Sequence, residues 1–306
     1  MKSKLQISND KSNWVVTTQD PFETGLVGMK VAKKFNIPFH IQVHTDFLSP
    51  HFSKGFLNKI RLKIANKTLP LADGVRVVSN RIKDSIINSK LKNQNSKITV
   101  MPVFVDAEKI ENSLAVFDLR AKYPQFNKII LIASRLEPEK DVHTALKAFS
   151  EVVRSNPKVG LVIVGDGSEK EILMSNVKSQ KLDEHVVFEG WQDDLNSYYK
   201  GCDIFLNTSL YEGYGMTLIE ASLNKKPMVT TDVGIAGGGG VLIHAQHALV
   251  APVGDAGRIA GYLNSFLRDS NGARAMGLRA YTKVSGEVIS QEKYYEEVVN
   301  DWVNTV

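Results

Sequence analysis

The sequence predicts an α/β fold built on parallel sheets, and three features of the chain support this class. Short apolar runs alternate with amphipathic helical segments, which is the pattern of a parallel sheet with helices on both faces. Residues 129–133 (IILIA) form an unbroken apolar run, typical of a strand that is buried on both faces. The chain has 306 residues and 43% hydrophobic content, enough to bury two cores.

The elements follow one another in the alternation that such a sheet requires. In the first part of the chain we expect strands at residues 15–18, 39–43, 74–78 and 98–101, separated by helices at 25–35, 54–71 and 80–89. In the second part we expect strands at residues 129–133, 161–164, 204–206 and 228–231, helices that begin at Val142 and near Met216, and a terminal helix at 291–303. The run Gly237 to Gly240 is interpreted as a flexible connection.

Two glutamates bracket a glycine-containing loop that leads into a helix. The segment reads Glu212, Gly213, Tyr214, Gly215, Met216, Thr217, Leu218, Ile219, Glu220. The glycines let the backbone approach a ligand closely, and the free N–H groups at the start of the helix suit a phosphate. The carboxylates are candidate acceptors for sugar hydroxyls. The alternative is an ordinary surface helix with two incidental acids.

Basic side chains follow the buried strand at residues 129–133. Arg135 and Lys140 lie in the loop between this strand and the next helix, at the carboxyl end of a parallel strand, where open α/β sheets bind ligands. Arg offers a planar fork for phosphate oxygens, and Lys offers a point charge. A second strand-to-helix turn, which starts at Gly165, is expected at the same edge. A solvated basic pair is the alternative for Arg135 and Lys140 taken alone.

The first part of the chain contributes one candidate and one ambiguous segment. His44 directly follows the expected strand at 39–43, where a lone histidine is more often structural. Residues 54–67 (KGFLNKIRLKIANK) are basic and partly amphipathic. They could lie on an anionic lipid surface, or they could form an ordinary helix with a solvated basic face.

Taken together, four motifs resemble the nucleotide-binding half of the family-4 retaining glycosyltransferases. They are SRLxxEKD from Ser134, VIVGDG from Val162, FEGW from Phe188 and YEGYGxxxxEA from Tyr211. The resemblance covers roughly residues 14–306 and implies the GT-B fold, with two Rossmann-like domains that have parallel sheets and face a cleft. By resemblance, residues 1–126 would be the acceptor-side domain, 127–285 the nucleotide-sugar-binding domain, and 286–306 a helix that returns to the first domain.

The resemblance also implies roles for individual residues. Arg135 and Lys140 match the pair that binds the donor diphosphate. Glu212 matches the residue that contacts the transferred sugar, and Glu220 the one that binds the ribose. Backbone near Trp191 would hold the base, and His44 matches a histidine that points toward the transferred sugar or the acceptor. The candidate catalytic residues are Glu212, His44, Arg135 and Lys140, and the candidate donor site comprises Arg135, Lys140, Gly165, Trp191, Glu212, Gly213, Tyr214, Gly215, Met216, Thr217 and Glu220.

The chain departs from the family pattern at its start. Family members have further βα units and a glycine-rich loop before the strand matching residues 15–18, so the first domain is expected to be incomplete. The segment at residues 102–106 resembles the family's interdomain linker, but Val103 and Phe104 replace its usual Asn-Gly.

Charge and cysteine content bear on partners and location. Residues 1–128 hold 21 Lys and Arg against 10 Asp and Glu, a net charge of +11, whereas residues 129–306 carry a net charge of −6. The basic half is expected to meet an anionic membrane surface or a phosphorylated acceptor, and no recognition motif supports nucleic acid. Cys202 is the only cysteine, so no intrachain disulfide can form. We expect a cytoplasmic protein, peripheral at the inner face of the cell membrane.

The resulting expectation is a glycosyltransferase that moves a sugar from a UDP- or GDP-sugar to a glycan or lipid-linked acceptor, with retention of anomeric configuration. No Asp-x-Asp motif is evident, so no metal and no other cofactor are expected. The alternative is a non-catalytic nucleotide-sugar-binding fragment or partner subunit that lacks a complete acceptor domain. The paired glutamates and basic loop argue against an epimerase, and the lack of a cofactor-bearing lysine motif argues weakly against a phosphorylase.

Overall fold

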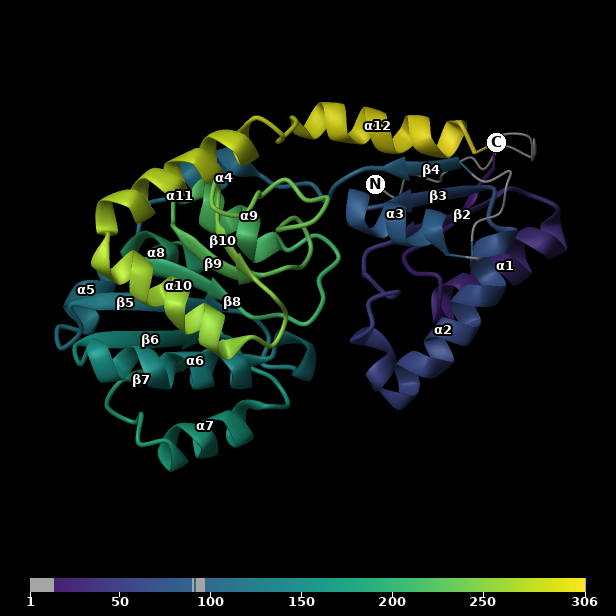
Figure 1. Cartoon of the computed structure of the whole chain (residues 1–306). Coiled ribbons are helices and arrows are strands. Elements are labelled where there is room, and N and C mark those ends of the chain that lie inside the picture. Colours follow the sequence, from purple (N-terminus) through teal and green to yellow (C-terminus); the bar gives the residue numbers. More distant parts are fainter. Residues whose placement is uncertain (1–13, 90, 92–96, 306) are drawn as a thin grey trace, which may run out of the picture. The chain divides into compact units, whose positions relative to one another are not determined.

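The computed structural model describes residues 14–89, 91 and 97–305, which divide into two compact units (Figure 1). The first unit contains the chain up to Phe104 together with the segment from Ile289 onward, and the second is Val105–Val288. This division falls earlier than the expected boundary at residue 127. The reason is that Val105, Leu119 and Phe126 pack into the core of the second unit.

The first unit is built on a four-stranded parallel sheet in the order β1-β2-β3-β4. All five residues of β2 and all four of β3 are buried, as expected for the central strands. The strands are β1 (Val16–Thr18), β2 (Phe39–Val43), β3 (Gly74–Val77) and β4 (Lys97–Val100), and the helices are α1 (Glu23–Phe35), η2 (Phe52–Lys54), α2 (Phe56–Thr68), η3 (Leu69–Leu71), α3 (Asn80–Asn88) and α12 (Gln291–Val303).

Helix α12 joins this sheet through buried polar contacts. His40 on β2 is fully buried, and its Nε2 lies 2.9 Å from Oδ2 of Asp301 on α12. Burial alone would raise the pKa of Asp301, but the hydrogen bonds from His40 and Thr99 and the charges of His40 and Arg76 together outweigh it, and the pKa is lowered. Arg76 on β3 donates to the hydroxyl of Tyr294 at 2.7 Å. Helix α12 therefore supplies polar partners to buried residues of the first unit's sheet.

The second unit contains a six-stranded parallel sheet in the order β10-β9-β8-β5-β6-β7. Read from its other edge, this is the 3-2-1-4-5-6 order of a Rossmann fold. Its strands are β5 (Lys128–Ala133), β6 (Val159–Val164), β7 (Val186–Gly190), β8 (Ile204–Asn207), β9 (Met228–Thr231) and β10 (Leu249–Ala251). Its helices are α4 (Ala107–Asn112), α5 (Leu119–Lys122), η4 (Pro138–Lys140), α6 (Val142–Ser155), α7 (Lys170–Ser179), α8 (Leu195–Gly201), α9 (Met216–Leu223), α10 (Ala256–Arg268) and α11 (Ser270–Ser285).

Helices cover both faces of this sheet, which explains the apolar run of β5. Ile130 and Ile132 face a core with α6, α7 and α10. Ile129 and Leu131 face a second core with α8 and α9, and α11 contributes to both. Successive residues of a strand point to opposite faces, so an unbroken apolar sequence is what this position requires.

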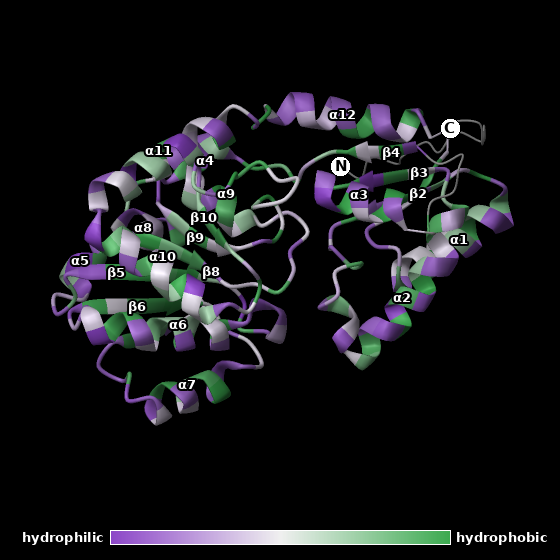
Figure 2. Ribbon diagram, in the orientation of Figure 1, coloured by the Kyte–Doolittle hydropathy of each residue, from purple (hydrophilic) through white to green (hydrophobic). Residues whose placement is uncertain are grey.

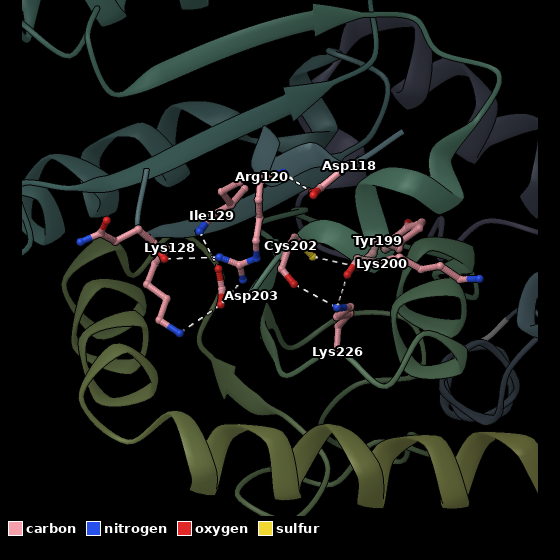
Figure 3. Close-up of polar contacts among 10 residues, drawn as sticks. Asp118, Arg120, Lys128, Ile129, Tyr199, Lys200, Cys202, Asp203 and Lys226 are labelled. Atoms are coloured by element: carbon pink, nitrogen blue, oxygen red, sulfur yellow. Dashed lines mark hydrogen bonds and ion pairs between the residues drawn. The ribbon is translucent and has the colours of Figure 1, made fainter. Parts of the chain in front are cut away.

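The amino ends of the two central strands, β5 and β8, are held together by one carboxylate (Figure 3). Asp203, directly before β8, accepts hydrogen bonds from Arg120 at 2.8 Å, from Lys128 at 3.1 Å and from the backbone N–H of Ile129 at 2.9 Å. Cys202 beside it is buried, and burial raises the pKa of its thiol to about 12, so it is an inert core residue.

We expect Asp301→Ala to lower the free energy of unfolding of the first unit by about 2–4 kcal/mol, because it leaves buried His40 without its partner. Denaturant unfolding followed by the fluorescence of Trp14 and Trp302, both in this unit, measures the loss. Because the pKa of Asp301 is lowered by folding, its contribution is complete above the unfolded value near 4. It disappears as the pH falls through the folded value.

The control for this prediction is Glu292→Ala, which removes an exposed carboxylate from the same helix. It should change the free energy of unfolding by about 0.5 kcal/mol or less. Equal losses for the two variants would contradict the assigned role of Asp301.

Candidate donor-binding site

The candidate site lies where the strand order of the second sheet reverses direction. The chain leaves β5 toward β6 on one side of the sheet and leaves β8 toward β9 on the other. In open α/β sheets such a reversal creates a crevice outside the carboxyl ends of the two central strands. The loops at residues 134–141 and 208–215 both leave the sheet at this crevice.

An ion pair joins these two loops. Nζ of Lys140, at the end of η4, lies 2.6 Å from Oε1 of Glu212, and each side chain is only 15% exposed. The hydroxyl of Ser209 is 2.8 Å from the same carboxylate oxygen. The backbone N–H of Leu210 donates to the carbonyl of Glu139 at 2.8 Å. The fold therefore brings the two sequence motifs together, although Lys140 and Glu212 are 72 residues apart in the chain.

The loop after Glu212 ends in an open helix N-terminus. Gly215, at the N-cap of α9, has a φ of 92°, a value that favours glycine, and it makes no side-chain hydrogen bond to the helix. The first backbone N–H groups of a helix have no partner within the helix, so those of Met216 and Thr217 are available to an anion, whereas that of Leu218 donates to the carbonyl of Gly215 at 2.9 Å. Behind this loop, the carbonyl of Tyr214 accepts a hydrogen bond from Ile235 at 2.9 Å.

Glu220 lies on α9 and is held by a buried phenol. The hydroxyl of Tyr199 donates to its Oε2 at 2.8 Å. Burial raises the pKa of the Glu220 carboxyl even though this hydrogen bond opposes the shift. The contact fixes the orientation of the carboxylate. A residue that accepts hydrogen bonds from a ligand needs such a fixed orientation.

Arg135 differs from Lys140 in its surroundings. Its side chain is 64% exposed and pairs with Glu139 at 2.9 Å. Beneath its loop, Gly165 has a φ of 131°, and a Cβ at this position would lie 1.9 Å from the carbonyl oxygen of Ser134. Gly165 thus allows the turn after β6 to pack against the loop that carries Arg135.

The remaining candidates are more isolated. Trp191, after β7, is 70% exposed, and its indole N–H donates to Asp193 at 3.3 Å. His44 belongs to the first unit, where it follows β2. Its Nε2 is buried without a hydrogen-bond partner among the described residues. Burial and the charge of Arg76 lower the pKa of His44, so the ring is neutral at pH 7.

Two supporting residues were missed by sequence reasoning. Ser209 contacts Glu212 and could have been found, because it is a hydroxyl in the loop that follows a predicted strand. Tyr199 supports Glu220 from another helix, α8, and no local pattern connects the two residues.

Two kinds of feature are absent from the described residues. No group of three or more His, Cys, Asp or Glu is placed to hold a metal ion among them. Within that same part of the chain, no helix is both long and apolar enough to cross a membrane.

Comparison with known families identifies the class of protein. The family model described as Glycosyl transferases group 1 matches residues 118–283, more than half of the chain. The model of Glycosyltransferase Family 4 matches residues 14–109. The chain belongs to the group 1 glycosyltransferases.

Curated relatives match most of this chain but a smaller part of their own length. The alpha-monoglucosyldiacylglycerol synthase of Streptococcus pneumoniae is 27% identical over 237 residues, which are 74% of this chain and 53% of the synthase. The N-acetyl-alpha-D-glucosaminyl L-malate synthase of Bacillus anthracis is 29% identical over 234 residues, which are 73% of this chain and 60% of that enzyme. The chain thus spans little more than half the length of these relatives.

Solved structures confirm the GT-B fold that the sequence predicted. Anabaena HepE in complex with UDP superposes with a TM-score of 0.77 at 21% identity and covers 95% of this chain and 78% of its own. The sucrose-phosphate synthase of Thermosynechococcus elongatus gives a TM-score of 0.79 at 22% identity and covers 93% and 71%.

We expect Gly165→Ala to destabilise the second unit by roughly 2 kcal/mol more than Gly190→Ala. Both glycines have positive φ, so both substitutions introduce backbone strain. Only at Gly165 does the added Cβ meet backbone, whereas nothing lies within 4 Å of it at Gly190. Thermal unfolding of the two variants isolates the steric effect, and equal shifts in Tm would contradict it.

Proposed function

We propose that this protein transfers a sugar from a nucleoside-diphosphate sugar to a glycan or lipid-linked acceptor, with retention of anomeric configuration. The Lys140–Glu212 pair carries the proposal, because it joins a cation and a sugar-hydroxyl acceptor at the crevice of a Rossmann sheet. In the reaction, the bond between the anomeric carbon and a diphosphate oxygen breaks, and a bond from that carbon to an acceptor oxygen forms.

Positive charge for the leaving diphosphate would come from this chain's own groups. Lys140 is held in the crevice, and the N–H groups that begin at Met216 point out of α9. Preorganised donors of this kind stabilise charge that develops in a transition state. Arg135, on the exposed side of the same loop, would add to this charge when it leaves Glu139. We propose that these groups make a metal ion unnecessary.

The acidic residues would then orient the donor. Glu212 would accept hydrogen bonds from the transferred sugar, and Glu220, fixed by Tyr199, from the ribose hydroxyls. The segment around Trp191 would lie near the base. His44, neutral at pH 7, would act on the sugar or the acceptor as a hydrogen-bonding group.

The comparisons support the nucleotide class and the type of acceptor. HepE has been solved in complex with UDP and with UDP-glucose. Relatives include a poly(glycerol-phosphate) alpha-glucosyltransferase of Bacillus subtilis and the alpha-monoglucosyldiacylglycerol synthases of Streptococcus pneumoniae and Acholeplasma laidlawii. We therefore favour a UDP-sugar over a GDP-sugar as the donor, and an acceptor that carries a lipid or phosphate group.

The second candidate is a nucleotide-sugar-binding chain without turnover. The Lys140–Glu212 pair fits this candidate as well, because it would bind a donor whether or not the sugar is transferred. Binding and turnover measurements separate the two candidates.

We expect Lys140→Ala to weaken UDP binding about 10- to 100-fold in calorimetry, because a charge-assisted contact to phosphate is lost. Uridine, which carries no phosphate, should bind with nearly unchanged affinity. Lys128→Ala is the matched control: it also removes an ion-paired lysine, but at the opposite edge of the sheet. Equal losses for UDP and uridine would contradict the assigned role of Lys140.

We expect Glu212→Gln to lower kcat at least about 100-fold without weakening UDP binding, because the substitution acts on the sugar and not on the diphosphate. Release of UDP from UDP-sugars measures turnover, and NMR of the product shows the anomeric configuration. The rate should be unchanged in EDTA, and the exposed control Glu184→Gln should behave as wild type. Tight UDP binding with no turnover of any donor by the wild-type chain would favour the binding protein instead.

A further inference from the structure

Helix α2 of the first unit contributes little to the core. Of its thirteen residues, only Ala65 and Thr68 are buried. The helix carries Lys59, Arg61, Lys63 and Lys67 and contains no Asp or Glu. A polar helix face on a soluble domain normally mixes both signs of charge, so an all-basic helix needs a separate explanation.

Large apolar side chains accompany these lysines on the solvent side. Phe56 is 77% exposed, Leu57 66% and Ile60 41%. At 100° per residue, Leu57 falls on the flank beside Thr68, Ile60 falls between this flank and the outer face, and Phe56 falls on the face opposite Ala65 and Thr68. Lys59, Lys63 and Lys67 fall on the same face and are exposed. We call this set of six residues, Phe56, Leu57, Lys59, Ile60, Lys63 and Lys67, the α2 surface, and Figure 2 shows the mixture of apolar and polar residues along the helix.

The fourth basic residue fixes the helix to its own unit. Arg61 pairs with Glu23 of α1 at 3.0 Å and lies over the ring of Phe22 at 5.9 Å. Arg61 therefore faces the body of the first unit, whereas the lysines of the α2 surface face away from it.

We propose that the α2 surface binds an anionic lipid bilayer and makes the protein a peripheral membrane protein. Apolar side chains flanked by lysines are what a helix parallel to a membrane requires. The rings and branched chains enter the acyl boundary, and the long lysine stems let the ammonium groups remain at the level of the headgroups. The absence of acids from α2 removes the repulsion that an anionic surface would otherwise exert, and this charge complementarity favours lipid over an uncharged partner. The inference does not depend on the proposed glycosyl transfer.

Flotation with vesicles tests the electrostatic part on the full chain. Binding should be strong with vesicles of three parts phosphatidylglycerol to seven parts phosphatidylcholine, weak with pure phosphatidylcholine, and reduced by salt. The variant Lys59→Gln/Lys63→Gln/Lys67→Gln should partition roughly 100-fold less. The matched control removes three exposed lysines from the second unit, Lys147→Gln/Lys158→Gln/Lys178→Gln, and should bind as wild type.

A second pair of variants tests the apolar part. Phe56→Ser/Leu57→Ser/Ile60→Ser should lower partitioning at least about tenfold. The control Leu114→Ser/Val116→Ser/Ile172→Ser replaces equally exposed apolar residues of the second unit and should have no effect. All these side chains are exposed, so circular dichroism and thermal unfolding of the four variants should match wild type.

A tryptophan at position 56 reports insertion directly. The emission of Phe56→Trp should shift to the blue on addition of anionic vesicles and should be quenched by brominated lipids. The proposal is overturned if wild type does not float with anionic vesicles, or if the controls lose as much binding as the α2 variants. It is also overturned if the α2 variants instead dissociate a dimer in sedimentation experiments, because a second copy would then be the occupant.

Discussion

The candidate site depends on one constraint, the neighbouring position of β5 and β8 at the centre of the second sheet. Because these strands are parallel, their carboxyl ends lie at one edge, and the loops that follow bring Lys140 within 2.6 Å of Glu212. Asp203 secures the opposite ends of the same two strands through Arg120 and Lys128. A shift in the pairing register of β5 and β8 would separate Lys140 from Glu212. The helices of the second unit pack around these two strands.

The ion pair is better explained by ligand binding than by stability. Two charges that are each 15% exposed lose much of their hydration, and a replacement by apolar residues would stabilise such a site at least as well. In the free protein the charges of Lys140 and Glu212 neutralise each other. A diphosphate that pairs with Lys140 would leave Glu212 available to accept hydrogen bonds from a sugar. The two parts of a donor would therefore be recognised together.

The sequence was sufficient for the local parts of the site and insufficient for the long-range parts. Periodicity and turn chemistry located nearly every strand that leads to the site, and the motifs identified Lys140 and Glu212. The support of Glu220 by Tyr199 was not predictable, because it depends on how α8 packs beside α9. The sequence also did not predict that the second unit begins at Val105. Leu119 and Phe126 are isolated apolar residues, and the residues that they pack against lie far along the chain. The structure brings Lys140 and Glu212 together, but the predicted roles of all the site residues, these two included, stay predictions.

The contact between His40 and Asp301 joins residues that are 261 positions apart. During synthesis on the ribosome, β2 emerges 261 residues before the carboxylate that satisfies its buried imidazole. The second unit is complete in sequence before that point. It can therefore finish folding first, while polar groups in the interior of the first unit stay hydrated until Asp301 has been made.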